Sequence, residues 1–345
     1  MQLQDVLNRA LESEAPTRDE MIRMLQYSEF SLEAGQIRAV GNQISRKRTN
    51  NHAFLSGQIG YSTAPCRGDC VFCVFGAGHS TFPVTEMSVG EVVAHARKFA
   101  SSGLLGNLFL MSMHNFDMGR FIELLRAVRE VLPQSVMITS NVGNLTLEEC
   151  KRLKQEGLNA AYQSVRLREG IDTKLDREER IQSVRNIQEA GLSWGFCCEP
   201  IGPEHSPEEL ADHILFGMSL KPDSMSAMRR VYLPNSPIAD RGQITLLRLA
   251  QIAAVVSLAA LADPAIKSIG SHEPNLIALT SGSVAGCAES GANPRDEAVE
   301  TTGKRGLTIN DLARMFYEAG FDGVVRADGS RLSLTNYFKT NQYHV

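Results

Sequence analysis

Residues 53–73 read AFLSGQIGYSTAPCRGDCVFC, a short apolar run followed closely by three cysteines. The run over residues 53–61 predicts a β-strand, and seven further runs of this kind alternate with segments of helical apolar spacing. Such alternation predicts βα units around a parallel sheet, which places the chain in the α/β class. Eight repetitions favour a closed TIM-type (β/α)8 barrel over an open sheet. The cysteines would then lie at the C-terminal mouth of the barrel, where barrel enzymes carry their chemistry.

The predicted elements divide the chain into two parts. Residues 1–50 are polar, show helical spacing and end in the basic run Arg46-Lys47-Arg48, so they predict an N-terminal helical extension. Residues 51–345 then form the barrel, including its C-terminal quarter. The other predicted strands are 107–113, 135–141, 160–167, 193–201, 224–233, 266–271 and 284–292. The predicted helices are 89–101, 119–131, 147–156, 177–190, 207–218, 244–262, 274–283 and 309–319.

Composition excludes several classes of protein. Of the 345 residues, 43% are hydrophobic and 21% are charged, which is typical of a globular chain and excludes disordered, collagen-like and coiled-coil proteins. A formal net charge of −4 gives no overall basic field, so we expect no nucleic acid partner. The most apolar stretch, residues 244–261, contains Arg248 and Gln251 and predicts a buried helix rather than a membrane span. The first residues show no signal-peptide pattern, so we expect a cytoplasmic protein.

The seven cysteines are not arranged like a disulfide scaffold, because their number is odd and Cys66, Cys70 and Cys73 are clustered. Such a cluster indicates metal binding or catalysis. Three thiolates can hold an iron–sulfur cubane and leave one iron open to a ligand. A zinc site with His79 as the fourth ligand is an alternative. A redox pair of Cys70 and Cys73 is another, although it leaves Cys66 unused.

The pattern Cys-x3-Cys-x-aromatic-Cys after a first strand, with Phe72 as the aromatic residue, resembles the signature of radical S-adenosylmethionine (SAM) enzymes. The resemblance implies that Cys66, Cys70 and Cys73 hold a 4Fe–4S cluster whose open iron binds SAM. Reductive cleavage of SAM then gives a 5′-deoxyadenosyl radical that abstracts hydrogen from a substrate. A reductant such as flavodoxin or ferredoxin is also implied.

The resemblance is closest to the biotin-synthase-like branch, which includes an FeFe-hydrogenase maturase and methylornithine synthase. It extends through Glu179-Arg180-Ile181 and residues 233–240 to Ser290-Gly291-Ala292-Asn293. It implies that Arg180 binds the SAM carboxylate, for which a guanidinium fork is suited. An exposed helix charge is the alternative for Arg180. Ile201 would pack against adenine.

Two implied SAM contacts depart from the family pattern. Ser112, Met113 and His114 follow the second strand, where relatives present backbone groups to the SAM amino group, but the usual Gly-Gly-Glu-like sequence is absent. His114 is either a polar contact or a surface residue at the strand end. Arg166 stands where relatives place an acidic residue on the ribose. Glu169 takes that role if the strand end is shifted.

A second, sulfur-donating cluster of the biotin synthase kind is disfavoured. Only Cys197 falls on an implied ligand position, and Cys198 points to the other face of its strand. We interpret Cys150 and Cys287, the latter placed before strand eight, as buried small hydrophobes. Cys197 is instead a candidate substrate contact.

Polar residues gather at the predicted strand ends, although the core of a barrel should be apolar. Two arginines there indicate a carboxylate or phosphate on the substrate, and Glu273 and Asp296 indicate an amine. The candidate substrate contacts are Tyr162, Cys197, Arg229, Arg230, His272, Glu273, Asn275, Asn293 and Arg295.

The leading hypothesis is a radical SAM enzyme that rearranges or fragments a small polar substrate, either amino-acid-like or a carboxylate, in cofactor or metabolite biosynthesis. The alternatives are a sulfur-inserting synthase of biotin or lipoyl type, with an unusual auxiliary cluster, and a non-catalytic zinc or iron–sulfur protein.

Overall fold

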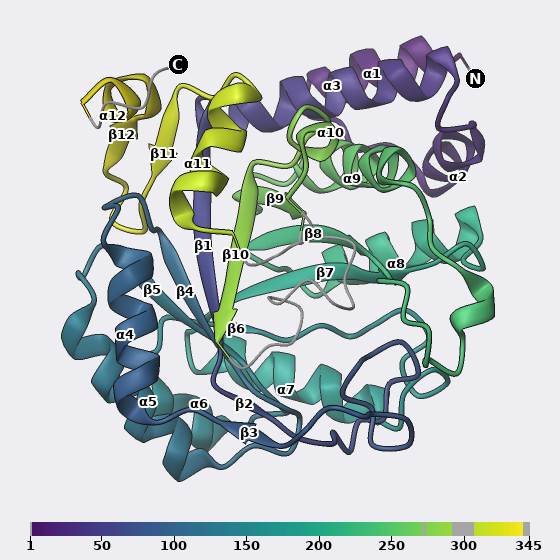
Figure 1. Cartoon of the computed structure of the whole chain (residues 1–345). Helices are drawn as coiled ribbons and strands as arrows, with labels where there is room; N and C mark the ends of the chain where they lie inside the picture. Colours follow the sequence, from purple (N-terminus) through teal and green to yellow (C-terminus); the bar gives the residue numbers. More distant parts are fainter. Residues whose placement is uncertain (1, 272–273, 292–306, 341–345) are drawn as a thin grey trace.

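The architecture is a closed barrel of parallel strands. A computed structural model describes residues 2–271, 274–291 and 307–340. Within these residues, eight strands pair in one parallel series, and the last pairs with the first (Figure 1). The series runs β1 (His52–Gly60), β4 (Asn107–Met111), β5 (Met137–Asn141), β6 (Ala160–Tyr162), β7 (Ser193–Ile201), β8 (Ser224–Arg229), β9 (Ser268–Ser271) and β10 (Ala285–Gly291). The predicted (β/α)8 barrel is confirmed.

Helices follow the strands, and most begin at a side-chain cap. Ser88, Thr146 and Ser206 each accept a bond from the backbone N–H three residues on, and a glutamate there bonds back to the cap residue. The helices are α4 (Val89–Ala100), α5 (Met118–Val131), α6 (Leu147–Gln155), α7 (Arg177–Glu189), α8 (Pro207–Ser219), α9 (Leu246–Ala260), α10 (Leu276–Leu279) and α11 (Ile309–Glu318).

Three helices, α1 (Leu3–Leu11), α2 (Arg18–Gln26) and α3 (Leu32–Thr49), precede the barrel. They lie at the end opposite to the arrowhead of β10, and α3 packs against α9 (Figure 1). From Leu249 to Ala260 every residue of α9 is buried, because the barrel and these helices cover it from different sides. That position explains the apolar stretch at residues 244–261. Among the described residues, no helix is long and apolar enough to cross a membrane.

Several boundaries differ from those predicted. Strand β6 ends at Tyr162 rather than at residue 167, and β8 ends at Arg229 rather than at residue 233. Helix α10 is four residues long, because the chain turns through Gly282 at φ +120° before β10. Cys287 lies inside β10, so its predicted place before that strand is wrong.

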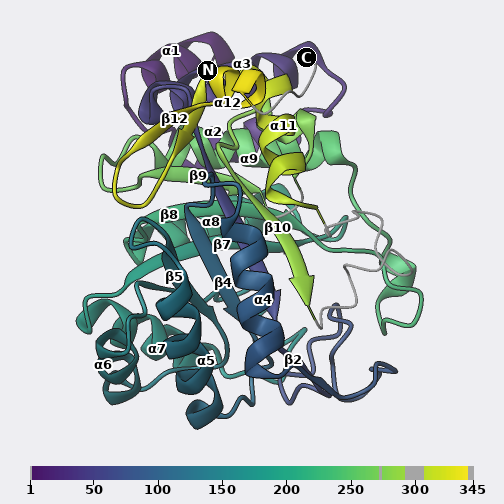
Figure 2. The same ribbon diagram turned by 60° about the vertical axis from the view of Figure 1, so that its left-hand side comes forward.

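The sequence did not predict an addition to the barrel sheet. Strand β11 (Gly323–Val325) pairs with the start of β1, and β12 (Arg331–Ser333) pairs antiparallel to β11 and leads into α12 (Leu334–Thr340). Helix α12 lies at the same end of the molecule as α1 and α3 (Figures 1 and 2). A separate small pair, β2 (Ser62–Thr63) with β3 (Thr85–Glu86), borders the cysteine loop in sequence.

Candidate active site

A cavity at the C-terminal ends of the strands brings the three clustered cysteines together with residues from most of the barrel strands. Because the loops after parallel strands meet at one end of a barrel, residues far apart in the sequence share this cavity. The predicted site residues that line it are Cys66, Phe72, Cys70, Cys73, Ser112, Met113, His114, Tyr162, Arg166, Arg180 and Arg230.

The cysteine loop is folded tightly on its own backbone. The Cys66 N–H donates to the Phe75 carbonyl at 2.7 Å, and the Cys73 N–H donates to the Cys70 carbonyl at 2.9 Å. Asp69 adopts a left-handed backbone at φ 42°, and its carboxylate accepts the Gly78 N–H at 2.7 Å. These bonds hold the three thiols on one short loop that faces the cavity.

The donor set fits a cluster better than a single zinc ion. Thiolates on one tetrahedral zinc lie about 3.8 Å apart, since each Zn–S bond is about 2.3 Å. The three thiols do not all lie within 4.8 Å of one another. His79 donates its Nε2–H to the Cys73 carbonyl at 2.7 Å and keeps Nδ1 as its possible ligand atom, but no three of these four side chains bring their ligand atoms within 4.8 Å of one another. Burial raises the pKa of Cys70 to about 12, so binding of a metal there must release a proton.

Arg180 is a buried cation at the cavity wall. It lies in the first turn of α7, which begins at the Asp176 cap, and is only 3% exposed, so the alternative of an exposed helix charge is wrong. Its Nη2 donates to the Ser164 carbonyl at 2.6 Å and its Nη1 donates to Asn144 Oδ1 at 3.1 Å. Its buried Nε has no hydrogen-bond partner. Burial, with the nearby Arg166, lowers its pKa to about 10, which is the signature of a guanidinium that an anion would stabilise.

Glu169 is bonded to other protein groups and is not among the cavity-lining residues. Its carboxylate accepts the Arg166 N–H at 2.8 Å and the Thr173 hydroxyl at 2.9 Å, and lies 3.8 Å from Arg180 Nε. Its predicted place against the ribose is therefore not supported, because both oxygens already hold protein groups. Arg166 does line the cavity, and its Nε lies 3.5 Å from the Glu199 carboxylate.

Four other predicted contacts do not reach the cavity. Ile201 is buried in the hydrophobic core, and Cys197 is fully buried. Arg229 donates to the Ile244 carbonyl at 2.8 Å, and Asn275 caps α10 by accepting the Ala278 N–H at 2.9 Å. Arg229 and Asn275 thus have structural contacts at the end of β8 and the start of α10. The predicted contacts His272, Glu273, Asn293 and Arg295 lie outside the described residues.

Sequence reasoning missed Ser164 and four other polar residues of the cavity wall, namely Gln58, Asn141, Glu199 and Glu289. These four lie on strands, and Gln58 pairs in register with Glu289. Gln58 Oε1 accepts from Asn141 at 3.1 Å. Their strand neighbours Ile59 and Ala288 belong to the hydrophobic core outside the sheet, so these side chains face the barrel interior. The available signal was a polar residue at alternate positions of an otherwise apolar strand.

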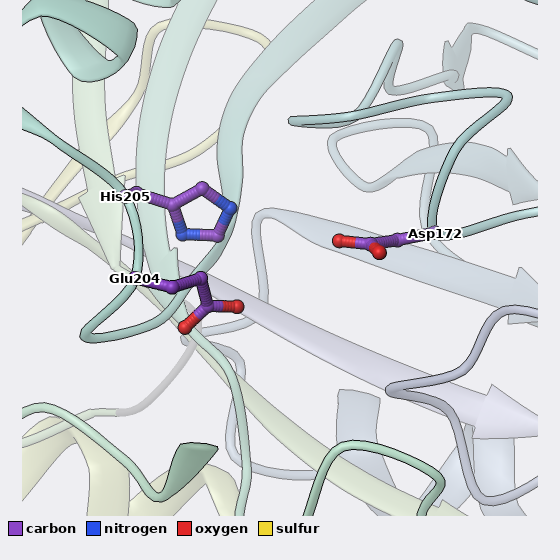
Figure 3. A group of neighbouring side chains, drawn as sticks. All are labelled: Asp172, Glu204 and His205. Carbon is purple, nitrogen blue, oxygen red and sulfur yellow. The ribbon is translucent and has the colours of Figure 1, made fainter.

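Beside the cavity, Asp172, Glu204 and His205 bring three possible metal-ligand atoms within 4.8 Å of one another (Figure 3). His205 Nδ1 accepts the Gly202 N–H at 2.9 Å. Burial lowers the pKa of His205, so the ring is neutral and Nε2 carries the proton. The carboxylate of Glu204 is held by Arg230, and Arg241 lies within 3.8 Å of both acids. The group is therefore an ion-pair network rather than a metal site.

Comparisons with known proteins agree with this geometry. The Radical SAM superfamily pattern matches residues 61–217. A biotin synthase of Streptomyces coelicolor is 23% identical over 285 residues, which cover 79% of this chain and 68% of that protein. The crystal structure of methylornithine synthase superposes with a TM-score of 0.79 at 15% identity, covering 94% of this chain and 98% of that one. The structure of the FeFe-hydrogenase maturase HydG of Carboxydothermus hydrogenoformans superposes with a TM-score of 0.74 at 16% identity, covering 94% of this chain and 80% of that one.

Proposed function

On the premise that this chain is a radical SAM enzyme resembling biotin synthase, we propose that it starts a rearrangement or fragmentation by hydrogen abstraction from a small polar substrate. Enzymes of this superfamily use a 4Fe–4S cluster and SAM. The observation that carries the proposal is the shared cavity of Cys66, Cys70, Cys73 and Arg180. In the proposal the three thiolates hold the cluster, and flavodoxin or ferredoxin is the class of reductant.

When bound, the cluster and SAM supply a 5′-deoxyadenosyl radical for hydrogen abstraction. The residues of this chain bind and orient SAM and enclose the reacting groups. Arg180 offers its Nε, which makes no hydrogen bond within the protein, to the SAM carboxylate, and its two other bonds keep the guanidinium from turning away. Phe72 and Met113 give the cavity apolar wall that excludes water from the reacting groups.

The charges of the barrel interior support a proposal for the substrate class. Glu199 and Glu289 face inward and are each 3% exposed, and Arg166 stands beside Glu199. Glu199 Oε1 has this ion pair but no hydrogen bond. A wall that carries both signs of charge suits a substrate with an amino and a carboxylate group, because an ammonium group would give the buried Glu199 Oε1 the hydrogen bond that it lacks. We therefore favour an amino-acid-like substrate.

Sulfur insertion is the second candidate, favoured by the likeness to biotin synthase. It needs an auxiliary cluster inside the barrel. Cys197 on β7 and Cys287 on β10 are the described cysteines on barrel strands that point inward, while the inward positions on β4 and β5 include Met111 and Asn141. Two thiols on strands that are not neighbours give little support to such a cluster. Rearrangement or fragmentation remains the proposal.

The test uses anaerobically purified, reconstituted protein with SAM and dithionite, and 5′-deoxyadenosine is measured by mass spectrometry. The expected result is product from the wild type and none from the Cys66→Ala, Cys70→Ala, Cys73→Ala triple variant. One bound zinc with no acid-labile sulfide would instead identify a non-catalytic zinc protein.

The substrate assignment is tested separately, with amino acids and their carboxylate analogues added to the same assay. A substrate should stimulate 5′-deoxyadenosine formation. Glu199→Gln should lose that stimulation and keep the unstimulated rate, because Glu199 binds the substrate and not SAM. Glu208→Gln, an exposed glutamate on α8, is the matched control. Equal stimulation in Glu199→Gln and wild type would refute the assignment.

A further inference from the structure

The segment that follows β4 contacts the cysteine loop at two points. The backbone N–H of His114 donates to Sγ of Cys66 at 3.4 Å. One residue further, Asn115 Oδ1 accepts the N–H of Arg67 at 3.1 Å. The segment is also held at its start, where the Ser112 N–H donates to the Asn141 carbonyl at 3.0 Å and the Ser112 hydroxyl bonds to Ser62 at 2.7 Å. The amide of His114 is therefore aimed at one of the three proposed cluster ligands by a braced backbone.

Gly143, in the turn after β5, lies so close to the backbone of His114 that only a residue without a side chain fits there. A Cβ on Gly143 would lie 1.9 Å from the His114 carbonyl oxygen and 2.9 Å from its carbonyl carbon. Real Cβ contacts with other atoms are essentially never shorter than 3.0 Å. The atoms met are backbone, so no side chain can rotate away to make room. Gly143 does not have a left-handed φ, so the requirement here is close approach and not conformation.

We propose that Gly143 is a positioning residue that seats the His114 peptide against Cys66 and so raises the reduction potential of the cluster. The inference rests on the proposed function, because it requires a cluster on Cys66. Reduction adds one negative charge to a cluster and its thiolates. An N–H dipole directed at a ligand sulfur stabilises that added charge more than it stabilises the oxidised state. Hydrogen bonds to cluster sulfurs are among the factors that set iron–sulfur potentials.

The clash is large enough to move the backbone around His114. An added Cβ must move from 1.9 Å to at least 3.0 Å from the His114 oxygen, so the two backbone segments must separate by about 1 Å. The His114 N–H···Sγ contact is already 3.4 Å between heavy atoms. A displacement of that order changes the distance and the angle of this contact, and hydrogen bonds weaken steeply with distance and misalignment.

The experiment compares Gly143→Ala with Gly90→Ala, each reconstituted to full iron and sulfide content. Gly90 lies in α4, and its Cβ would meet only Ser88 Oγ at 4.0 Å. The reduction potential of each protein is measured by electron paramagnetic resonance during an anaerobic redox titration. We expect a more negative potential for Gly143→Ala and an unchanged potential for Gly90→Ala. An unchanged or more positive potential in Gly143→Ala, or an equal shift in Gly90→Ala, overturns the inference.

A second variant covers the case in which Gly143→Ala does not take up the cluster. Asn115→Ala removes the acceptor for Arg67 and loosens the same segment without any clash. It should shift the potential in the same direction by a smaller amount, and no shift would overturn the inference. A wild-type protein that binds no cluster would refute the proposed function itself. A loaded cluster without a shift refutes only the role of Gly143.

Discussion

At the scale of the residue, the site is built from groups that are costly to bury. Arg180 is nearly inaccessible to solvent, its pKa is lowered by burial, and its nearest carboxylate, on Glu169, is shared with Arg166 and Thr173. Its Nε still lacks a hydrogen bond. An anionic ligand in the cavity would complete the pairing of this buried cation.

Replacement of Arg180 by lysine should therefore weaken SAM binding and leave the cluster intact. A lost charged hydrogen bond is worth about 1.5–3 kcal/mol, which raises the dissociation constant for SAM roughly 10- to 150-fold. Equilibrium dialysis with the reconstituted protein measures this change. Arg185→Ala, an exposed position on the same helix, is the control and should bind SAM like the wild type. Equal affinities for Arg180→Lys and wild type would contradict the assigned role.

At the scale of the element, α8 carries a partly buried histidine that should make the fold acid-sensitive. His213 packs against Phe196 of β7 and Phe216 of its own helix, and burial lowers its pKa to about 3. A group whose folded pKa lies below its unfolded value stabilises the protein fully above the unfolded pKa. That stability is lost as the pH falls from about 6.5 toward 3.

His213→Phe should flatten this pH dependence. At pH 5 this histidine binds a proton in the unfolded chain and not in the folded one, which lowers the free energy of unfolding by about 2 kcal/mol. The variant should lose less stability than the wild type between pH 7 and pH 5, measured by urea unfolding at both values. Any destabilisation caused by the larger phenylalanine ring is the same at both pH values, so it does not affect the difference in stability between pH 7 and pH 5. Parallel pH dependence in the two proteins would show that His213 does not titrate on unfolding.

The elements of the barrel could be predicted because most of them carry a periodic apolar face. The 9-residue strands β1 and β7 and the capped helices α6 and α8 match their predicted ranges to within about one residue. Strands β11 and β12 were missed because three residues are too short to show a period. Within the site, the spacing of the three clustered cysteines was sufficient to predict that they lie together at the mouth of the barrel. Gln58, Glu199 and Glu289 could be recognised only once the barrel register showed which face of each strand points inward.

At the scale of the whole molecule, the site and the supporting helices occupy opposite ends of the barrel. Helices α3 and α9 meet at Gly41, where a Cβ would lie 2.9 Å from the Cβ and 3.0 Å from the Cα of Ala254. The cysteine loop follows the other end of β1. Stability and cofactor binding should therefore be separable by mutation.

Gly41→Ala should destabilise the fold by about 1–3 kcal/mol, because the two helices must move apart. Gly35→Ala, on the same helix but with only Arg38 Nη2 at 4.0 Å, should stabilise it by up to about 1 kcal/mol through helix propensity. Thermal unfolding measures both changes. Neither variant should alter the iron content of the folded protein, and a cluster lost from Gly41→Ala below its unfolding temperature would contradict the separation.

The most direct test of the central claim is the iron and sulfide content of single cysteine variants. We predict about four irons and four sulfides per wild-type chain, and the same for Cys150→Ala, whose thiol is buried in α6 away from the cavity. Cys66→Ala, Cys70→Ala and Cys73→Ala should each lose the cluster. Wild-type content in any of these three variants, or loss of the cluster in Cys150→Ala alone, would contradict the account.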